Sequence, residues 1–308
     1  MLVFRRLSWL CLAFGACGVP HYTFDQGSAG ASGSAGSGGG GTNGQGGFSA
    51  GGNGNGGEVA ASGAAGQSAT EPAFTYEPFT VTPGALNGKG SGFGWASGST
   101  WAATGGSTTD PTATDLMPLT FGMLDGNASY ARGSMGVSAG RKLDNGFSGP
   151  WGDYLSNSVI GKSGKEVWIS ALLRLDATNT SDTALVLHAA SDPNMLDAPR
   201  ISIGYFGAAS QDAGTKYWSL RLGSQVLRSG VAIDASAALL VVRVTFGSPS
   251  LADLFVDSAL GTTPMTPDAS GSAADLKFGS VAYLPGTGSA LDEIRIGPSY
   301  ASVTPLSN

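Results

Sequence analysis

The stretch EVWISALLRL, residues 166–175, decides how this chain folds. Apolar side chains occupy every second position, namely Val167, Ile169, Ala171, Leu173 and Leu175. A period of two places these side chains on one face of a β-strand. The stretch therefore predicts a strand with one face against a core.

The same alternation recurs through the last two thirds of the chain. It is clear in residues 239–246 (LLVVRVTF), 200–205 and 217–222, and further strands are expected near 79–86, 183–188, 251–256 and 290–296. Gly, Pro, Asn, Asp and Ser separate these runs, as turns require. No stretch shows a clear amphipathic helix of three turns. Many strands without crossover helices predict an all-β, antiparallel two-sheet sandwich.

Three segments of the chain resemble a known family of domains. The family is that of the concanavalin A-like, laminin G-like jelly rolls of exported bacterial proteins, and the segments are YEPFTVTPGALNGKGSGFGW (76–95), KEVWISALLRLD (165–176) and LDEIRIGPSYASVTP (291–305). The likeness covers about residues 77–305 and is weakest between 96 and 140. It implies a jelly roll whose N- and C-terminal strands lie side by side. It also implies a family better known for sugar binding and adhesion than for one shared activity.

The first residues indicate export. Arg5 and Arg6 precede an apolar run, residues 7–14, that is too short to cross a hydrocarbon core of about 30 Å. The following Gly15-Ala16-Cys17 resembles a lipobox, which implies cleavage before Cys17 and acylation of that residue. The alternative is an ordinary secreted protein with a free thiol at Cys17. We expect a lipid-anchored protein of the bacterial outer membrane or cell surface.

Composition divides the remaining chain into two parts. The chain has 50 glycines, and many of them lie before residue 67. That part of the chain has almost no apolar surface whose burial could offset the entropy lost on ordering. We therefore expect residues 1–16 to be a signal peptide, 17–70 a disordered Gly/Ser-rich tether and 71–308 the sandwich. Cys11 would leave with the signal peptide, so the core is expected to form without disulfides.

Charge argues against one class of partner. Removing Arg5 and Arg6 from the 16 basic residues leaves 14, against 22 acidic ones. Nucleic-acid binding needs basic surface that displaces counterions. We expect no nucleic-acid partner.

Catalytic patterns are weak. The chain has five Glu, at 58, 71, 77, 166 and 293, and none begins the E-x-D-x-x-E arrangement of β-glucanases with their two close carboxylates. His188 ends an apolar strand, where a histidine is usually structural, and the expected sandwich has no G-x-S-x-G. The sequence predicts a non-catalytic domain. A degenerate glycoside hydrolase is the weaker alternative.

Sugar binding needs an aromatic platform with hydrogen-bonding groups beside it. The best candidates are Trp151, Asp153 and Tyr154 in the loop GPWGDY, followed by Trp95 and Trp101. The competing interpretation is burial for packing, which is commoner for large aromatic residues. Trp168 and Trp218 lie in strands and are expected in the core.

Asp292 suggests a metal site. Strict alternation gives it the parity of Ile294 and Ile296, so its carboxylate would point into the core and need a partner. Related jelly rolls often hold a structural calcium between first and last strands, and Glu77 could supply the second carboxylate. The alternative is an Asp292 that accepts backbone N–H bonds in a turn.

Together these features predict a surface-anchored lipoprotein with a non-catalytic, carbohydrate-binding or adhesion sandwich. Its partners would be a membrane, reached through the lipid, and a glycan or other cell-surface ligand. The alternative is a structural envelope protein that contacts other proteins and binds no glycan. The sequence does not predict an oligomeric state.

Overall fold

The computed structural model describes residues 72–104, 111–114, 118–124, 126, 129–133, 136–144, 146, 149–189 and 200–307. Cys17 and the predicted signal peptide and tether lie outside the described residues. No helix within the described ranges is long and apolar enough to cross a membrane.

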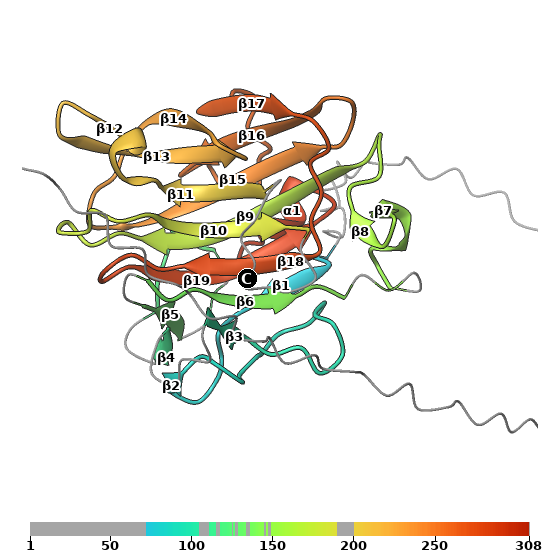
Figure 1. The fold of residues 1–308 in the computed structure, drawn as a ribbon, viewed down its shortest axis with the longest axis horizontal. Helices are drawn as coiled ribbons and strands as arrows, with labels where there is room; N and C mark the ends of the chain where they lie inside the picture. Colours follow the sequence, from blue (N-terminus) through green and yellow to red (C-terminus); the bar gives the residue numbers. More distant parts are fainter. Residues whose placement is uncertain are drawn as a thin grey trace, which may run out of the picture. The chain divides into compact units, whose positions relative to one another are not determined.

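One sheet has nine strands and antiparallel pairing throughout (Figure 1). Its order is β17-β16-β15-β9-β19-β5-β4-β2, and β1 also pairs with β19. The bounds are β1 Thr75–Glu77, β2 Gly84–Ala85, β4 Thr112–Thr114, β5 Tyr130–Arg132, β9 Glu166–Arg174, β15 Ala237–Thr245, β16 Ser250–Val256, β17 Ala269–Ala273 and β19 Ala290–Gly297.

The second sheet has eight strands in the order β12-β13-β11-β10-β18-β6-β3, with β14 paired to β13. Its strands are β3 Ala102–Ala103, β6 Ala139–Lys142, β10 Thr183–His188, β11 Arg200–Tyr205, β12 Gln211–Asp212, β13 Thr215–Leu222, β14 Gln225–Ala232 and β18 Ser280–Leu284. The small elements are β7 Leu155–Ser156, β8 Val159–Ile160, the 3-10 helices η2 Gly152–Tyr154 and η3 Gly207–Ser210, and α1 Tyr300–Val303.

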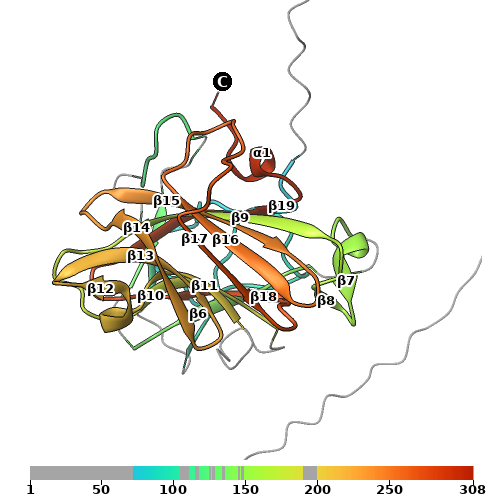
Figure 2. The ribbon, with the colours of Figure 1, turned by 90° about the horizontal axis from the view of Figure 1, so that it is seen from above.

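The two sheets stack face to face around one large apolar core (Figure 2). Alternate side chains of β9 and β15, including Val167, Ile169, Leu240 and Val242, enter this core. A second apolar cluster covers the outer face of the nine-stranded sheet, where α1 packs on β9 and β19. The predicted all-β, two-sheet jelly-roll sandwich is confirmed.

The first and last strands lie side by side, as the resemblance implied. Thr75 pairs with Ile296 and Glu77 with Ile294. The strand expected over 79–86 is interrupted, because Phe79 has a φ of 52° and a pairing strand resumes only at Gly84. The other expected strands are present, with their ends shifted by at most two residues.

A β-bulge in β19 changes the predicted direction of Asp292. The register shifts between Asp292 and Arg295, and Glu293 has a φ of 54°. One extra residue reverses the parity of the positions that follow it. Asp292 consequently pairs with Leu172 of the outer cluster, whereas Ile294 enters the central core.

Candidate functional site

The predicted aromatic platform is buried. The Trp151 side chain is fully inaccessible in the central core, its indole N–H donates to Thr75 Oγ1 at 3.3 Å, and its ring meets Phe74 and Tyr154 edge to face. A sugar therefore cannot stack on Trp151 in this conformation. Asp153 is exposed and Tyr154 half-buried, so the loop presents them without the tryptophan.

Trp95 and Trp101 are also core residues. Trp101 is fully buried and stacks on Phe79, while Trp95 is 8 % exposed and lies under the Arg141 guanidinium. Large rings gain more from burial here than from solvent contact. Trp168 and Trp218 are buried, as predicted.

Glu77 is the centre of a buried hydrogen-bond network. Its carboxylate accepts from the Phe79 amide at 3.0 Å, from the Trp101 indole at 3.0 Å, and from Ser91 and Arg141. The pKa of Arg141 is lowered by burial, and the charge of Glu77 opposes that shift. The network joins the first strand to the opposite sheet.

Asp292 lies on the other face of the nine-stranded sheet. It is fully buried, its Oδ1 accepts from the Glu293 amide at 2.9 Å, and its Oδ2 has no partner among the described residues. Burial, and then the charge of Glu293, raises the pKa of Asp292 to about 9. The group is thus a neutral acid at pH 7.

The predicted calcium pair is not brought together. Glu77 opposes Ile294 and enters the interior, whereas Asp292 opposes Leu172 and faces the outer cluster. The four hydrogen bonds to Glu77 also occupy the oxygens that a cation would need. Among the described residues, no group of three or more His, Cys, Asp or Glu side chains could hold a metal ion.

A surface pocket lies in a different part of the molecule. A cavity of about 230 Å³ lies where the ends of β9 and β13 meet the β14–β15 connection. We name it the strand-end pocket, and its lining is Leu175, Asp176, Ala177, Gly214, Thr215, Lys216, Ile233, Asp234 and Ala235. Segments attached to both sheets contribute, since residues 175–177 follow β9 and residues 233–235 precede β15 in one sheet, whereas Thr215 and Lys216 belong to β13 in the other.

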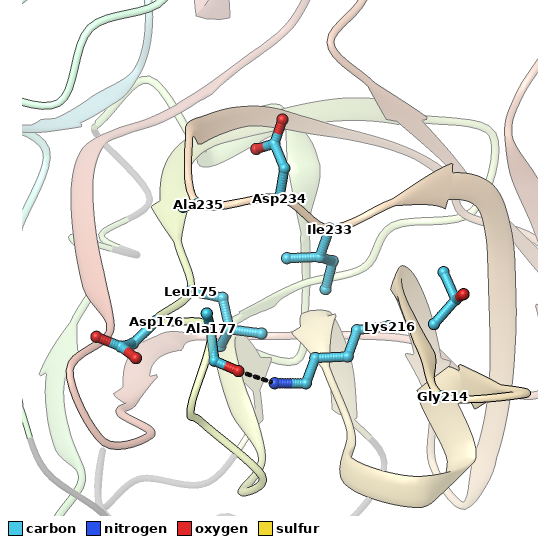
Figure 3. A pocket seen from close by; sticks show the side chains of 9 residues that line it. Leu175, Asp176, Ala177, Gly214, Lys216, Ile233, Asp234 and Ala235 are labelled. Atoms are coloured by element: carbon cyan, nitrogen blue, oxygen red, sulfur yellow. Dashed lines mark hydrogen bonds between the residues drawn. The ribbon is translucent and has the colours of Figure 1, made fainter.

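The pocket has an apolar interior and a polar edge (Figure 3). The side chains of Leu175, Ile233 and Lys216 lie within it, whereas the carboxylates of Asp176 and Asp234 lie at its edge and point away from those three side chains. Backbone pairing holds two sides together, because the Ile233 amide donates to the Lys216 carbonyl at 2.8 Å.

Lys216 is held in place rather than free. Its ammonium donates to the carbonyls of Ala177 at 2.8 Å and Asn179 at 2.5 Å, and it lies 5.7 Å from the centre of the Tyr205 ring. The lysine thereby ties the segment after β9 to β13.

The two edge carboxylates are each oriented by a local turn. Asp176 Oδ1 accepts from the amide and hydroxyl of Thr178, and Asp234 Oδ1 accepts from the Ser236 amide at 2.7 Å. The hydrogen bonds from Thr178 lower the pKa of Asp176, so it is ionised at neutral pH. Neither Oδ2 accepts a hydrogen bond from a residue that the structure describes.

Sequence reasoning missed this pocket. Its residues come from three segments, 175–177, 214–216 and 233–235, and β14 lies between the last two. Leu175 and Asp176 end the KEVWISALLRLD segment, which predicted a strand and not a site. Only the position of each segment beside a strand end could have indicated a shared site.

Comparison with known proteins yields fold likenesses alone. No protein-family model and no curated protein matches the sequence. The globular domain of T. cruzi calreticulin is 11 % identical, with 62 % of this chain and 83 % of that chain covered at a TM-score of 0.36. The Emp47p carbohydrate recognition domain is 9 % identical, with coverages of 74 % and 99 % and a TM-score of 0.32. A Shewanella oneidensis protein of unknown function is 11 % identical, with coverages of 78 % and 92 % and a TM-score of 0.35.

Proposed function

We propose that the sandwich is a non-catalytic carbohydrate-binding module that holds one sugar unit in the strand-end pocket. The observation that carries the proposal is the pairing of an apolar interior with oriented carboxylates at the edge. Sugar rings offer C–H patches and hydroxyl donors, which match those two surfaces. The cavity, about 230 Å³, is smaller than the roughly 300–1,000 Å³ typical of drug-sized ligands, which favours a single ring.

The lining favours binding over catalysis. Asp176 has a lowered pKa, whereas a general acid in a glycosidase needs a raised one. Histidine, serine and cysteine are missing from the described lining, and these residues supply the common nucleophile and base pairs. Lys216 is engaged by two carbonyls.

The anchor belongs to the same proposal. Acylation of Cys17 would attach the chain to a bacterial outer membrane or cell surface, with the Gly/Ser-rich segment as tether. Mass spectrometry of the mature N-terminus tests this, and an unmodified Cys17 would refute it.

The sugar site is tested by titrating the full chain with a panel of monosaccharides, observed by saturation-transfer NMR. Replacing Asp176 by Asn removes the charge of the acceptor that would bind the sugar hydroxyls, so affinity should fall by about tenfold. Asp153→Asn is the matched control, since Asp153 is exposed outside the pocket, and it should bind normally. If no sugar of the panel binds, the result would instead favour an envelope protein without a glycan ligand.

A further inference from the structure

Three segments without a charged residue meet on the outer side of the nine-stranded sheet. They are 118–124 (PLTFGML), 258–267 (SALGTTPMTP) and 304–307 (TPLS), and their apolar side chains pack against the outer cluster. Figure 2 shows α1 and the last described residues on this side of β9 and β19, away from the eight-stranded sheet. We call the three segments together the apolar tip.

Direct contacts hold the apolar tip together. Leu124 forms an antiparallel bridge with Leu306, and the Ser307 amide donates to the Met123 carbonyl at 2.9 Å. The 258–267 segment joins them, because a Cβ on Gly261 would lie only 3.4 Å from Leu306 Cδ1. The three segments therefore present one surface.

This surface exposes large apolar side chains. Met123 is 65 % exposed, Leu306 46 % and Met265 95 %. Exposed apolar side chains that gather in one place mark a contact surface. Asp257 and Asp268 flank the 258–267 segment, but their carboxylates accept from backbone amides of the adjoining strands. The apolar tip thus offers apolar contact without charge.

A lipid surface fits the apolar tip better than a second protein does. Protein interfaces usually involve about 20–30 residues a side, whereas the tip exposes three large apolar side chains. A membrane contact can be this small, because anchoring keeps the chain close to the bilayer and makes a weak contact effectively intramolecular. The chain has 22 acidic and 16 basic residues, so an uncharged surface also avoids repulsion from anionic head groups.

The chain enters the sandwich on the same side. The Cα of Ala73 lies 3.2 Å from the position of a Cβ on Gly297, and Ser302 of α1 contacts the same position. Residues 18–71 join this point to Cys17, and a Gly/Ser-rich chain of that length spans about 40 Å on average. A lipid on Cys17 would therefore hold this side of the sandwich within reach of the bilayer.

We propose that the apolar tip contacts the membrane, with Met123, Met265 and Leu306 entering the interfacial layer of the bilayer. The inference rests on the proposed acylation of Cys17 and adds a second, weaker attachment to it. The second attachment also sets the orientation of the sandwich. The outer face of the nine-stranded sheet turns towards the lipid, and the eight-stranded sheet turns away from it.

The test places a fluorescent probe on the apolar tip of the mature, acylated protein in phosphatidylcholine vesicles. Met123→Cys carries an environment-sensitive dye, and Leu251→Cys, at a position 48 % exposed in β16 outside the tip, carries the same dye as the matched control. Acylation protects Cys17 from labelling. We expect blue-shifted emission at position 123 that nitroxide-labelled lipids quench, and aqueous, unquenched emission at position 251.

Charged substitutions then test which side chains make the contact. Leu306→Asp with Met265→Asp, added to the labelled Met123→Cys chain, should abolish the quenching, because a carboxylate resists transfer into lipid. Leu251→Asp in the same labelled chain should leave the quenching unchanged. All three positions are exposed, so the melting temperatures should stay the same. Quenching should persist in 1 M NaCl, because salt screens charges and not apolar contacts.

The outcomes separate the contact from the anchor. An acylated chain whose probe at position 123 is not quenched would overturn the contact and keep the anchor. An unmodified Cys17 in mass spectrometry would overturn the anchor, and this inference with it. Blue-shifted emission that nitroxide-labelled lipids do not quench would assign the tip to a second copy of the chain and overturn the lipid contact. A loss of quenching in salt would refute an apolar contact.

Discussion

Removing the Glu77 carboxylate should destabilise the sandwich more than any exposed substitution. Glu77→Ala would leave the Arg141 guanidinium, which is 8 % exposed, without its anion, and breaking such a buried pair costs about 3–5 kcal/mol. The Trp101 indole and the Phe79 amide would also lose their acceptor, at about 1 kcal/mol or more each. We expect a loss of about 5–7 kcal/mol, a large share of the roughly 5–15 kcal/mol typical of a domain.

The assay is equilibrium urea unfolding followed by tryptophan fluorescence. Glu77→Gln keeps the shape and an acceptor oxygen, so its loss should be smaller. The double variant Glu77→Ala with Arg141→Met should recover part of the stability, because no unpaired charge then remains in the interior. A loss below about 1 kcal/mol in Glu77→Ala, or full additivity in the double variant, would contradict the network described here.

Three other perturbations test separate features. Folding raises the pKa of Asp292 from 3.8 to about 9, so its contribution to stability is complete below pH 4 and is lost as the pH rises towards 9. The free energy of unfolding of the wild type should therefore fall between pH 4 and pH 9 by up to about 1.4 kcal/mol per pH unit relative to that of Asp292→Asn, as measured by urea titrations. Gly94→Ala should cost about 2–5 kcal/mol, because a Cβ would lie 2.1 Å from the Phe74 carbonyl oxygen, whereas Gly98→Ala, with a similar positive φ and open space, should cost only about 1–2. Trp151→Ala should lower stability by about 3–5 kcal/mol in calorimetry, and an unchanged melting temperature would contradict its burial.

Sequence patterns predicted the fold well where alternation was uninterrupted. Val167 through Leu175 and Leu240 through Phe246 alternate without a bulge, and both runs enter the central core. The pairing of first and last strands followed from the family resemblance at residues 291–305, and the Thr75–Ile296 register confirms it. Local period and turn chemistry were sufficient for this level of description.

The functional residues were harder to predict because they depend on distant contacts. Asp292 was assigned to the wrong face since nothing in DEIRI marks Glu293 as the bulged residue with positive φ. The burial of Trp151 depends on Thr75, 76 residues away, and the partner of Glu77 is Arg141, 64 residues away. No local pattern encodes such pairings.

The position of β19 in its sheet has a consequence for how the chain reaches this state. The final strand, Ala290–Gly297, lies between β9 and β5, and β1 also joins the sheet through it. Residues 75–77 and 130–132 therefore stay unpaired on that side until residues 290–297 have been synthesised. Contacts of such long sequence separation slow folding and expose strand edges to other chains in the meantime. A chain truncated before residue 290 should accordingly expose unpaired strand edges, aggregate readily and bind chaperones strongly.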